Sequence, residues 1–258
     1  MKSFARIIDS QICYNESMTR VVDLTNGRVR IALSNIRDGD MRTIGKTGAD
    51  LEKIRENREK FLNKIGLKTS DTILVMCDYN SENFCRYDVA KNVWRGRGMI
   101  RDNDRPDFSV SVSANDALAT REPNLGLFLP LADCLGAVIF DPCEQVLCVA
   151  HLGRHATEQF GAQRVVEFLH ERFGSRTQDL QIWLSPAAGK TNYPLYKFTN
   201  QSLREVNISQ FVKAGVRKEN IFGEDIDTTF SRNYFSHSNF SKGAQKLDGR
   251  FAIVAKIV

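Results

Sequence analysis

The sequence predicts a single α+β domain with a largely antiparallel or mixed sheet. Short apolar runs of strand length recur along the chain, and amphipathic segments of helix length lie between them. No linker, internal repeat or low-complexity tract divides the 258 residues, which suffice for one large core. Together these observations favour one domain over two small ones.

The predicted strands are apolar runs that end at turn residues. Residues 19–34 are expected to form a hairpin, because Asn26-Gly27 is a strong signal for a two-residue turn between β-rich flanks. Residues 93–107 are rich in glycine and charge, and they predict a surface loop. The other predicted strands cover residues 72–77, 125–132, 136–140, 145–151, 180–184 and 251–258, with one more near residue 220.

Three helices are predicted from apolar residues at helical spacing. In residues 50–65 the apolar side chains fall on one face and the charges on the other. In residues 157–173 the same spacing runs from Ala162 to Phe173, and Gly174 is placed to end the helix. A third helix is expected at residues 199–214.

Composition and charge narrow the class of protein. The formal net charge of +5 is too weak to predict a nucleic-acid partner, and no apolar run approaches the length of a membrane span. The N-terminal residues lack the apolar region of a signal peptide. Six cysteines are scattered without a CxxC pair, several of them within apolar runs, as is typical of reduced thiols. We therefore expect a cytoplasmic protein.

Residues 116–156 place chemically active side chains at the ends of two apolar runs. The first run leads to Asp133 and Cys134, and the second ends on His151. Because strand ends hold side chains rigidly, Cys134 and His151 are expected to lie close together at one end of the sheet. A cysteine and a histidine serve equally well as nucleophile and base or as two ligands of one zinc ion. The residues themselves leave both interpretations open.

Several segments, in the same order along the chain, resemble the YfiH-type family, whose members are described as multicopper polyphenol oxidoreductase (laccase) domain proteins. The Asn57-Arg58 pair matches the family's ENR, and the ADC and AH elements are the most specific part. The resemblance runs from roughly residue 16 to the C-terminus, so residues 1–258 are expected to form one domain of this family. The matching segments are DALAT, LPLADCLGAVIFDP, VAHLGRHA, LSPAAGKTNY, FSHSNF and GRFAIVA.

The resemblance implies a single-domain α/β sandwich with a mixed sheet, the fold that the family shares with the cysteine deamidase domain of cytotoxic necrotizing factor toxins. It also implies a zinc ion bound by a histidine, a cysteine and a second histidine. Copper is the less convincing metal, because no blue-copper cluster is recognisable. The implied chemistry is phosphorolysis of purine nucleosides and deamination of adenosine. Carried onto this sequence, the catalytic residues are Cys134, His151 and Asp133.

The chain departs from the family at the first metal ligand. The family's first histidine lies in a QVHG motif, whereas this chain reads VMCDYNSENF, in which Cys77 and Asp78 are the aligned replacements. Either side chain can bind zinc, the thiolate more tightly. The expected metal ligands are therefore Cys134, His151 and Cys77.

The pocket residues differ as well. The Trp-Arg pair that follows the family's AHAG is replaced by Arg154-His155. The family's Arg-Asp pair is missing from the segment FSHSNF, where His237 appears instead. The residues expected to bind substrate are Asn57, Arg58, Arg154, His155 and His237.

The sequence favours an enzyme of the purine nucleoside phosphorylase or adenosine deaminase type. We expect it to act on a purine nucleoside, with phosphate, through a Cys/His metal site that holds zinc, or no metal if the missing histidine has abolished binding. Two alternatives stay open. One is a metal-free hydrolase or deamidase with Cys134 as nucleophile and His151 as base, and the other is a non-catalytic ligand-binding protein. No nucleic-acid or membrane partner is expected.

Overall fold

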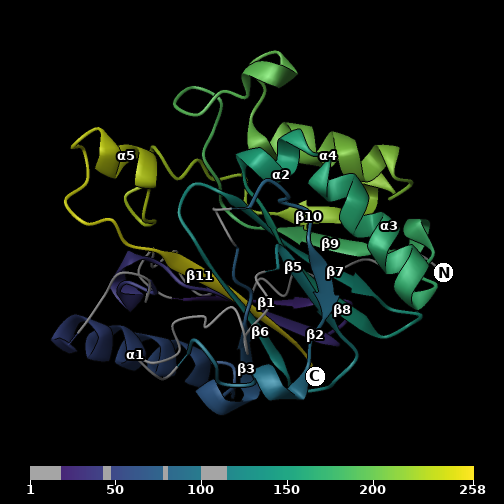
Figure 1. Ribbon diagram of the computed structural model, residues 1–258, viewed down its shortest axis with the longest axis horizontal. Helices are drawn as coiled ribbons and strands as arrows, with labels where there is room; N and C mark the ends of the chain where they lie inside the picture. Colours follow the sequence, from purple (N-terminus) through teal and green to yellow (C-terminus); the bar gives the residue numbers. More distant parts are fainter. Residues whose placement is uncertain (1–18, 43–47, 78–80, 100–114) are drawn as a thin grey trace.

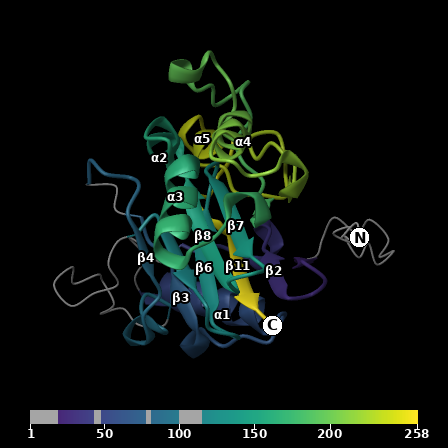
Figure 2. The same ribbon diagram turned by 90° about the vertical axis from the view of Figure 1, so that its right-hand side faces the viewer.

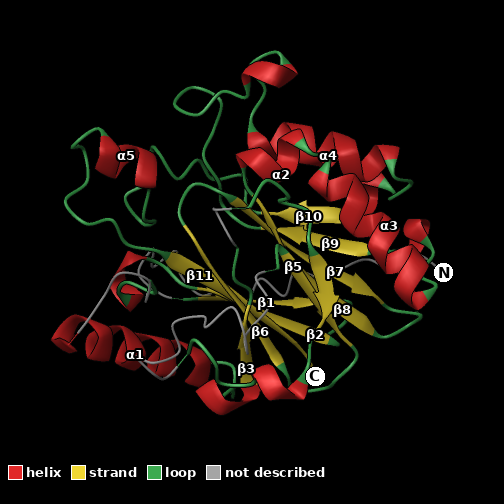
Figure 3. Cartoon of the chain, in the orientation of Figure 1, coloured by secondary structure: helices red, strands yellow, loops and turns green. Residues whose placement is uncertain are grey.

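The computed structural model describes residues 19–42, 48–77, 81–99 and 115–258. They form four layers (Figures 1 and 2), with the strands inside and the longer helices outside (Figure 3). Helix α1 (Gly48–Asn63) covers a five-stranded sheet, which packs face to face on a six-stranded sheet. Helices α3 (Gly161–Phe173) and α4 (Leu203–Lys213) cover the far side of the second sheet. The predicted α+β sandwich is confirmed, with two mixed sheets.

The first sheet is antiparallel except at one edge. The edge strand β3 runs parallel to β6, and all other neighbours are antiparallel. The C-terminal strand β11 lies at the centre, so the last segment of the chain joins the first hairpin to the rest of the sheet. In spatial order the strands are β1 (Arg20–Leu24), β2 (Val29–Leu33), β11 (Phe251–Ile257), β6 (Gly126–Leu131) and β3 (Thr72–Leu74).

The second sheet is antiparallel in the middle and parallel at both edges. Strands β7 and β8 form its centre, and β10 and β4 are the parallel edge strands. In spatial order the strands are β10 (Ile221–Gly223), β9 (Gln181–Leu184), β7 (Leu135–Asp141), β8 (Val146–Leu152), β5 (Ala117–Thr120) and β4 (Tyr87–Val89).

Strand alternation explains why apolar runs are continuous in the central strands. Along β11, Phe251 and Ile253 point into the core between the sheets, whereas Ala252 and Val254 pack toward α1. Because both faces of this strand are covered, its residues 251–255 are all apolar and do not alternate with polar residues as in a strand that has one face in solvent. Each large apolar side chain buried in this way stabilises the fold by about 1.5–3 kcal/mol.

Most predicted elements are confirmed with shifted ends. The hairpin is confirmed, but its turn is longer than the two residues expected: Leu24 pairs with Val29, so residues 25–28 connect the strands, and Thr25, Asn26 and Gly27 all have positive φ. The helix predicted at 157–173 is instead two helices, α2 (Arg154–Glu158) and α3, because Phe160 has a φ of 62° and breaks the helical run. Strand β3 is shorter than predicted, and three elements were not predicted: β4, β5 and α5 (His237–Ser241). Part of the predicted 93–107 loop lies outside the described residues.

The topology brings several strand ends together on one side of the molecule. Cys77 follows β3, Cys134 lies between β6 and β7, and His151 is near the end of β8. Asp116 immediately precedes β5, the neighbour of β8. Among the described residues, no helix is both long and apolar enough to cross a bilayer.

Candidate functional site

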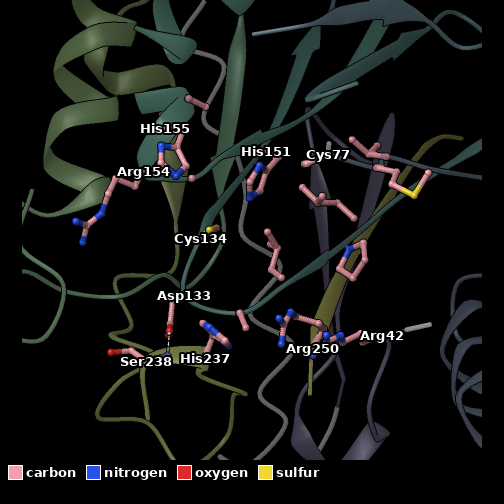
Figure 4. Close-up of a pocket in the computed structure, with 18 of the residues that line it drawn as sticks. Arg42, Cys77, Asp133, Cys134, His151, Arg154, His155, His237, Ser238 and Arg250 are labelled. Carbon is pink, nitrogen blue, oxygen red and sulfur yellow. Dashed lines mark hydrogen bonds between the residues drawn. The ribbon is translucent and has the colours of Figure 1, made fainter. Parts of the chain in front are cut away.

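A cavity of about 610 Å³ opens where these strand ends meet (Figure 4). Its size is in the range of small-molecule sites. Residues from both sheets, from α2 and from α5 line it, including Cys77, Cys134, His151 and Arg250. A pocket at this place can therefore hold a ligand against strand ends that the core keeps in position.

The register of the second sheet places Asp116 beside His151. Ala117 of β5 pairs with Ala150 of β8, so the residue before β5 lies next to the residue after Ala150. The backbone N–H of His151 donates to the carbonyl of Asp116 at 2.7 Å. Both side chains are almost fully buried. A rigid antiparallel pair thus carries an imidazole and a carboxylate at one end.

The same logic places Cys134 opposite Gly153. Leu135 of β7 pairs with Leu152 of β8, so the next residues outward face each other. A Cβ atom on Gly153 would lie 3.0 Å from the Cys134 sulfur and 3.2 Å from Nε2 of His151. The thiol and the imidazole therefore flank one small space that only a glycine leaves open. The sequence expectation that these two strand ends meet agrees with this arrangement.

Cys77, Asp116 and His151 form a group suited to holding a metal ion. One ligand atom from each lies within 4.8 Å of the others, and all three side chains are mostly or fully buried. Cys77 and His151 line the cavity, and Asp116 is not among the lining residues. Cys77 follows β3 of the first sheet, whereas Asp116 and His151 belong to the strand ends of the second sheet, so the group joins the two sheets.

Two of the three metal ligands expected from the sequence, Cys77 and His151, belong to this group. Cys134 is not a member of it, although it is close enough for its charge to act on the Cys77 thiol. Asp116 was not predicted. A signal for it exists, since it stands directly before the apolar run ALAT as Asp133 stands at the end of another. Asp78 lies outside the described residues.

Burial sets the protonation states in the group. It raises the pKa of the Cys77 thiol well above its usual value, and the charge of Asp116 raises it further. It lowers the pKa of His151 to about 4, so the imidazole is neutral at physiological pH. A neutral imidazole is the form that binds metals. A metal ion at this place would have to displace the Cys77 proton, as metal binding to thiols does.

The Cys134 thiol is also kept protonated by its surroundings. Burial raises its pKa to about 12 and the Asp133 charge adds to the rise, while Arg250 and Arg154 partly oppose it. A thiol nucleophile instead needs a lowered pKa. Cys134 therefore lacks the activation that a free catalytic cysteine shows.

Asp133 holds the turn that presents Cys134. Its carboxylate accepts from the Thr228 hydroxyl and from the Ser238 backbone N–H, both at 2.7 Å, and the second bond is drawn in Figure 4. Its backbone carbonyl accepts from Ala188 N–H, and its φ is 72°. The side chain of Asp133, expected to assist catalysis, thus connects Thr228 and Ser238 to the strand end, and its backbone connects Ala188.

Arg154 and His155 begin α2 and form one wall of the cavity. The His155 ring stacks on Phe84, with ring centres 4.6 Å apart and planes at 22°. The guanidinium of Arg154 lies over the Tyr193 ring at 4.3 Å. Phe84 and Tyr193 also line the cavity, so two aromatic contacts fix this wall. Flat faces of this kind suit a planar ligand such as a nucleobase.

Of the Asn57-Arg58 pair, only Arg58 lines the cavity. Arg58 is 1% exposed, and its guanidinium donates to the carbonyls of Met41 and Gly98. Asn57 donates to the carbonyl of Asp40. Both side chains therefore tie α1 to neighbouring backbone.

His237 of α5 belongs to a charged cluster with Asp248 and Arg250, which precede β11, and with Arg42. Its Nδ1 lies 2.9 Å from Asp248, whose carboxylate also binds Arg42 and Arg250. Arg42 and Arg250 line the cavity as well and were not predicted. Arg250 stands in the segment GRFAIVA, but nothing in the sequence shows that it meets Arg42, which lies in none of the matching segments.

The lining is strongly cationic. Among the lining residues that the structure describes, Asp133 is the only carboxylate, and both of its oxygens are already hydrogen-bonded. Such a cavity favours a ligand with negative charge. The lining cations are Arg42, Arg58, Arg154, Lys242 and Arg250.

Known proteins resemble this chain in sequence. A model of the family described as "Multi-copper polyphenol oxidoreductase laccase" matches residues 40–257. A relative, "Purine nucleoside phosphorylase YlmD" of Bacillus subtilis (strain 168), is 27% identical over 122 residues. That alignment covers 47% of this chain and 42% of the relative, less than half of either protein.

Solved structures resemble it in fold. The hypothetical protein YfiH of Bacillus licheniformis has a TM-score of 0.75 at 21% identity and covers 95% of this chain and 100% of its own. YlmD from Geobacillus stearothermophilus also has a TM-score of 0.75, at 19% identity, and covers 92% of this chain and 96% of its own. At such identities the likeness concerns the fold alone.

Proposed function

The chain belongs to the multi-copper polyphenol oxidoreductase laccase family, and on this basis we propose that it is a metal-dependent purine nucleoside phosphorylase. The resemblance in the motifs is confirmed by the match over residues 40–257. One observation carries the proposal: Cys77 and His151, two members of the Cys77–Asp116–His151 group, line a cavity with an excess of positive charge. The name of the Bacillus subtilis relative supports a purine nucleoside as substrate.

The donor set fits zinc better than copper. A thiolate, a carboxylate and an imidazole are all ordinary zinc ligands, and three protein ligands with an open fourth position are typical of catalytic zinc. Blue-copper sites instead use two histidines and a cysteine, and the group contains one histidine. The whole sequence has only four histidines. A zinc ion held here would supply Lewis-acid polarisation of the substrate.

The cavity offers the two subsites that phosphorolysis requires. A nucleoside needs an apolar and aromatic wall, which Phe84, Tyr193 and the His155 ring provide. Phosphate needs cations, which the lining arginines and Lys242 provide. In the reaction a phosphate oxygen forms a bond to C1′ of the ribose, and the C1′–N bond breaks with its electrons and a proton going to the base.

Phosphorolysis is favoured over a metal-free Cys134 nucleophile on geometric and electrostatic grounds. Cys134 is partly buried, and its surroundings raise its pKa to about 12, chiefly through burial and the charge of Asp133. The cationic lining has no role in a neutral deamidation but offsets the charge of phosphate. Deamination of adenosine needs no anion either, so the same lining also favours phosphorolysis over that reaction.

The proposal is tested with purified protein carrying zinc and no histidine tag. We expect inosine or adenosine to release free base and a ribose phosphate only when inorganic phosphate is present, and His151→Ala to abolish the release. Ammonia formed from adenosine without phosphate would indicate a deaminase instead. Neither base nor ammonia from either nucleoside would contradict the proposal and favour the non-catalytic alternative.

A further inference from the structure

We propose that Arg42 and Arg250, held together by Asp248, form a phosphate-binding subsite in the cavity. This inference deepens the proposed function and rests on it for the reaction, although binding itself can be measured without turnover. Figure 4 shows the two arginines next to each other, on the side of Cys134 away from Arg154 and His155.

A single carboxylate fixes both guanidinium groups. One Asp248 oxygen accepts from Arg42, and the other accepts from Arg250 at 2.7 Å and faces His237 Nδ1 at 2.9 Å. Burial acts to raise the pKa of Asp248, but the bonds from His237 and Arg250 outweigh it and hold that pKa below its usual range. Two guanidinium groups on one ionised carboxylate leave one positive charge in excess.

The backbone around the pair is also fixed. The carboxylate of Asp40 accepts from the backbone N–H groups of both Arg42 and Arg250, at 2.9 and 2.8 Å. Met41 N–H donates to the Arg250 carbonyl. The two arginines are thus held by their backbones and by their side chains, and little entropy remains to be lost when a ligand binds.

Arg250 keeps donors for a ligand. Among the described residues, the Arg250 side chain donates hydrogen bonds only through Nη1, to the Asp248 carboxylate and to the Gly249 carbonyl. Nε and Nη2 remain, and a guanidinium binds phosphate through two parallel N–H donors. Arg250 is also near enough to Cys134 for its charge to lower the pKa of that thiol. A phosphate bound here would lie in the same cavity as Cys134 and His151.

The charge of the surroundings selects a dianion. Lys242 adds a further cation to the lining, while Asp133, the lining carboxylate, is turned toward Thr228 and Ser238. A phosphate monoester carries a charge of about −1.5 to −2 at pH 7, and inorganic phosphate is at least singly negative there. The phosphate group can come from inorganic phosphate or from a nucleotide, and the two sources are separated by experiment.

The test measures inorganic phosphate binding by calorimetry at constant ionic strength, without nucleoside. Arg42→Gln and Arg250→Gln should each raise the Kd for phosphate by about tenfold or more, as expected for loss of a charged hydrogen bond. Arg121→Gln is the matched control. It removes a guanidinium paired with Glu144 outside the cavity and should leave the Kd unchanged. Arg42→Lys and Arg250→Lys keep the charge and should give smaller losses, and they replace any Gln variant that fails to fold.

The outcomes separate this inference from the proposed function. Unchanged phosphate affinity in the arginine variants overturns the subsite, even if the wild type cleaves nucleosides with phosphate. Weakened phosphate binding in a protein that cleaves no nucleoside supports the subsite and contradicts the proposed function. A third outcome is that a purine nucleoside 5′-monophosphate binds to the wild type, whereas inorganic phosphate does not. If the arginine variants then lose nucleotide binding, the subsite is supported and its phosphate group belongs to a nucleotide. If the wild type cleaves nucleosides, the Arg42 and Arg250 variants should show a higher KM for phosphate and no other change in their kinetic constants.

Discussion

Cys134 lies directly opposite Gly153 across the β7–β8 pair, and its sulfur is 3.0 Å from the place where a Cβ atom on Gly153 would stand. The backbone of Gly153, with φ −75° and ψ −179°, suits any residue. The glycine is therefore required by the space between the thiol and His151, and not by backbone conformation.

Gly153→Ala should disturb the site more than the fold. The added methyl displaces the Cys134 thiol or the His151 ring, so we expect nucleoside turnover to fall by about tenfold or more, with a stability loss of about 1–3 kcal/mol from overpacking. Gly174→Ala is the control: its φ of +75° makes alanine unfavourable, yet no atom lies within 4 Å. It should lower the melting temperature and leave turnover unchanged. Equal turnover in wild type and Gly153→Ala would contradict the proposed geometry.

Zinc content should depend on Cys77 and Asp116 and not on Cys134. Elemental analysis should find about one zinc per chain in the wild type and in Cys134→Ser, and a large loss in Cys77→Ser and in Asp116→Asn. The reason is that the ligand atoms of Cys77, Asp116 and His151 lie within 4.8 Å of one another. If zinc survives Cys77→Ser but is lost in Cys134→Ser, the zinc ligand is Cys134 and not Cys77.

Asp133→Ala should destabilise the protein by about 3 kcal/mol, because each charged hydrogen bond contributes about 1.5–3 kcal/mol and two are lost. Urea unfolding followed by circular dichroism measures this value. Thr228→Val removes one of the two partners and should cost less than Asp133→Ala. A loss below about 1 kcal/mol for Asp133→Ala would show that the carboxylate is not what fastens the turn.

The Asp248 cluster should make stability depend on acid. The folded-state pKa of Asp248 is lowered, so the ionised carboxylate stabilises the fold above its usual value near 3.8 and loses that effect as the pH falls further. Asp248→Asn should therefore lower the melting temperature at pH 7 relative to wild type. The difference should shrink steadily below about pH 4. A difference that is constant from pH 7 to pH 3 would assign the effect to packing.

The fold was predictable where local chemistry decides it. Asn26-Gly27 determines a hairpin, and the spacing of apolar residues determines most of α3. The break at Phe160 was missed because it rests on a left-handed backbone, with a φ of 62°, that a bulky residue rarely adopts, so the residue type carries no signal for it. Strands β4 and β5 were missed because each is three or four residues long and is held by its neighbour.

The candidate site was predictable in part for a similar reason. Cys134 and His151 stand at the ends of apolar runs, so their position in one sheet could be inferred from sequence. Asp116 and Arg250 stand in the segments DALAT and GRFAIVA, yet neither was assigned a role, and Arg42 has no signal in the sequence, because the neighbours of all three come from other segments of the chain. Their contacts depend on strand register and on the packing of two sheets, which single-residue patterns do not encode.

The Cys77–Asp116–His151 group also depends on the contact between the two sheets. Pairing of β5 with β8 brings Asp116 and His151 together, whereas Cys77 follows β3 of the other sheet. A substitution in the core that shifts one sheet against the other would therefore separate Cys77 from the other two side chains, so the complete ligand set reports on the packing between the sheets.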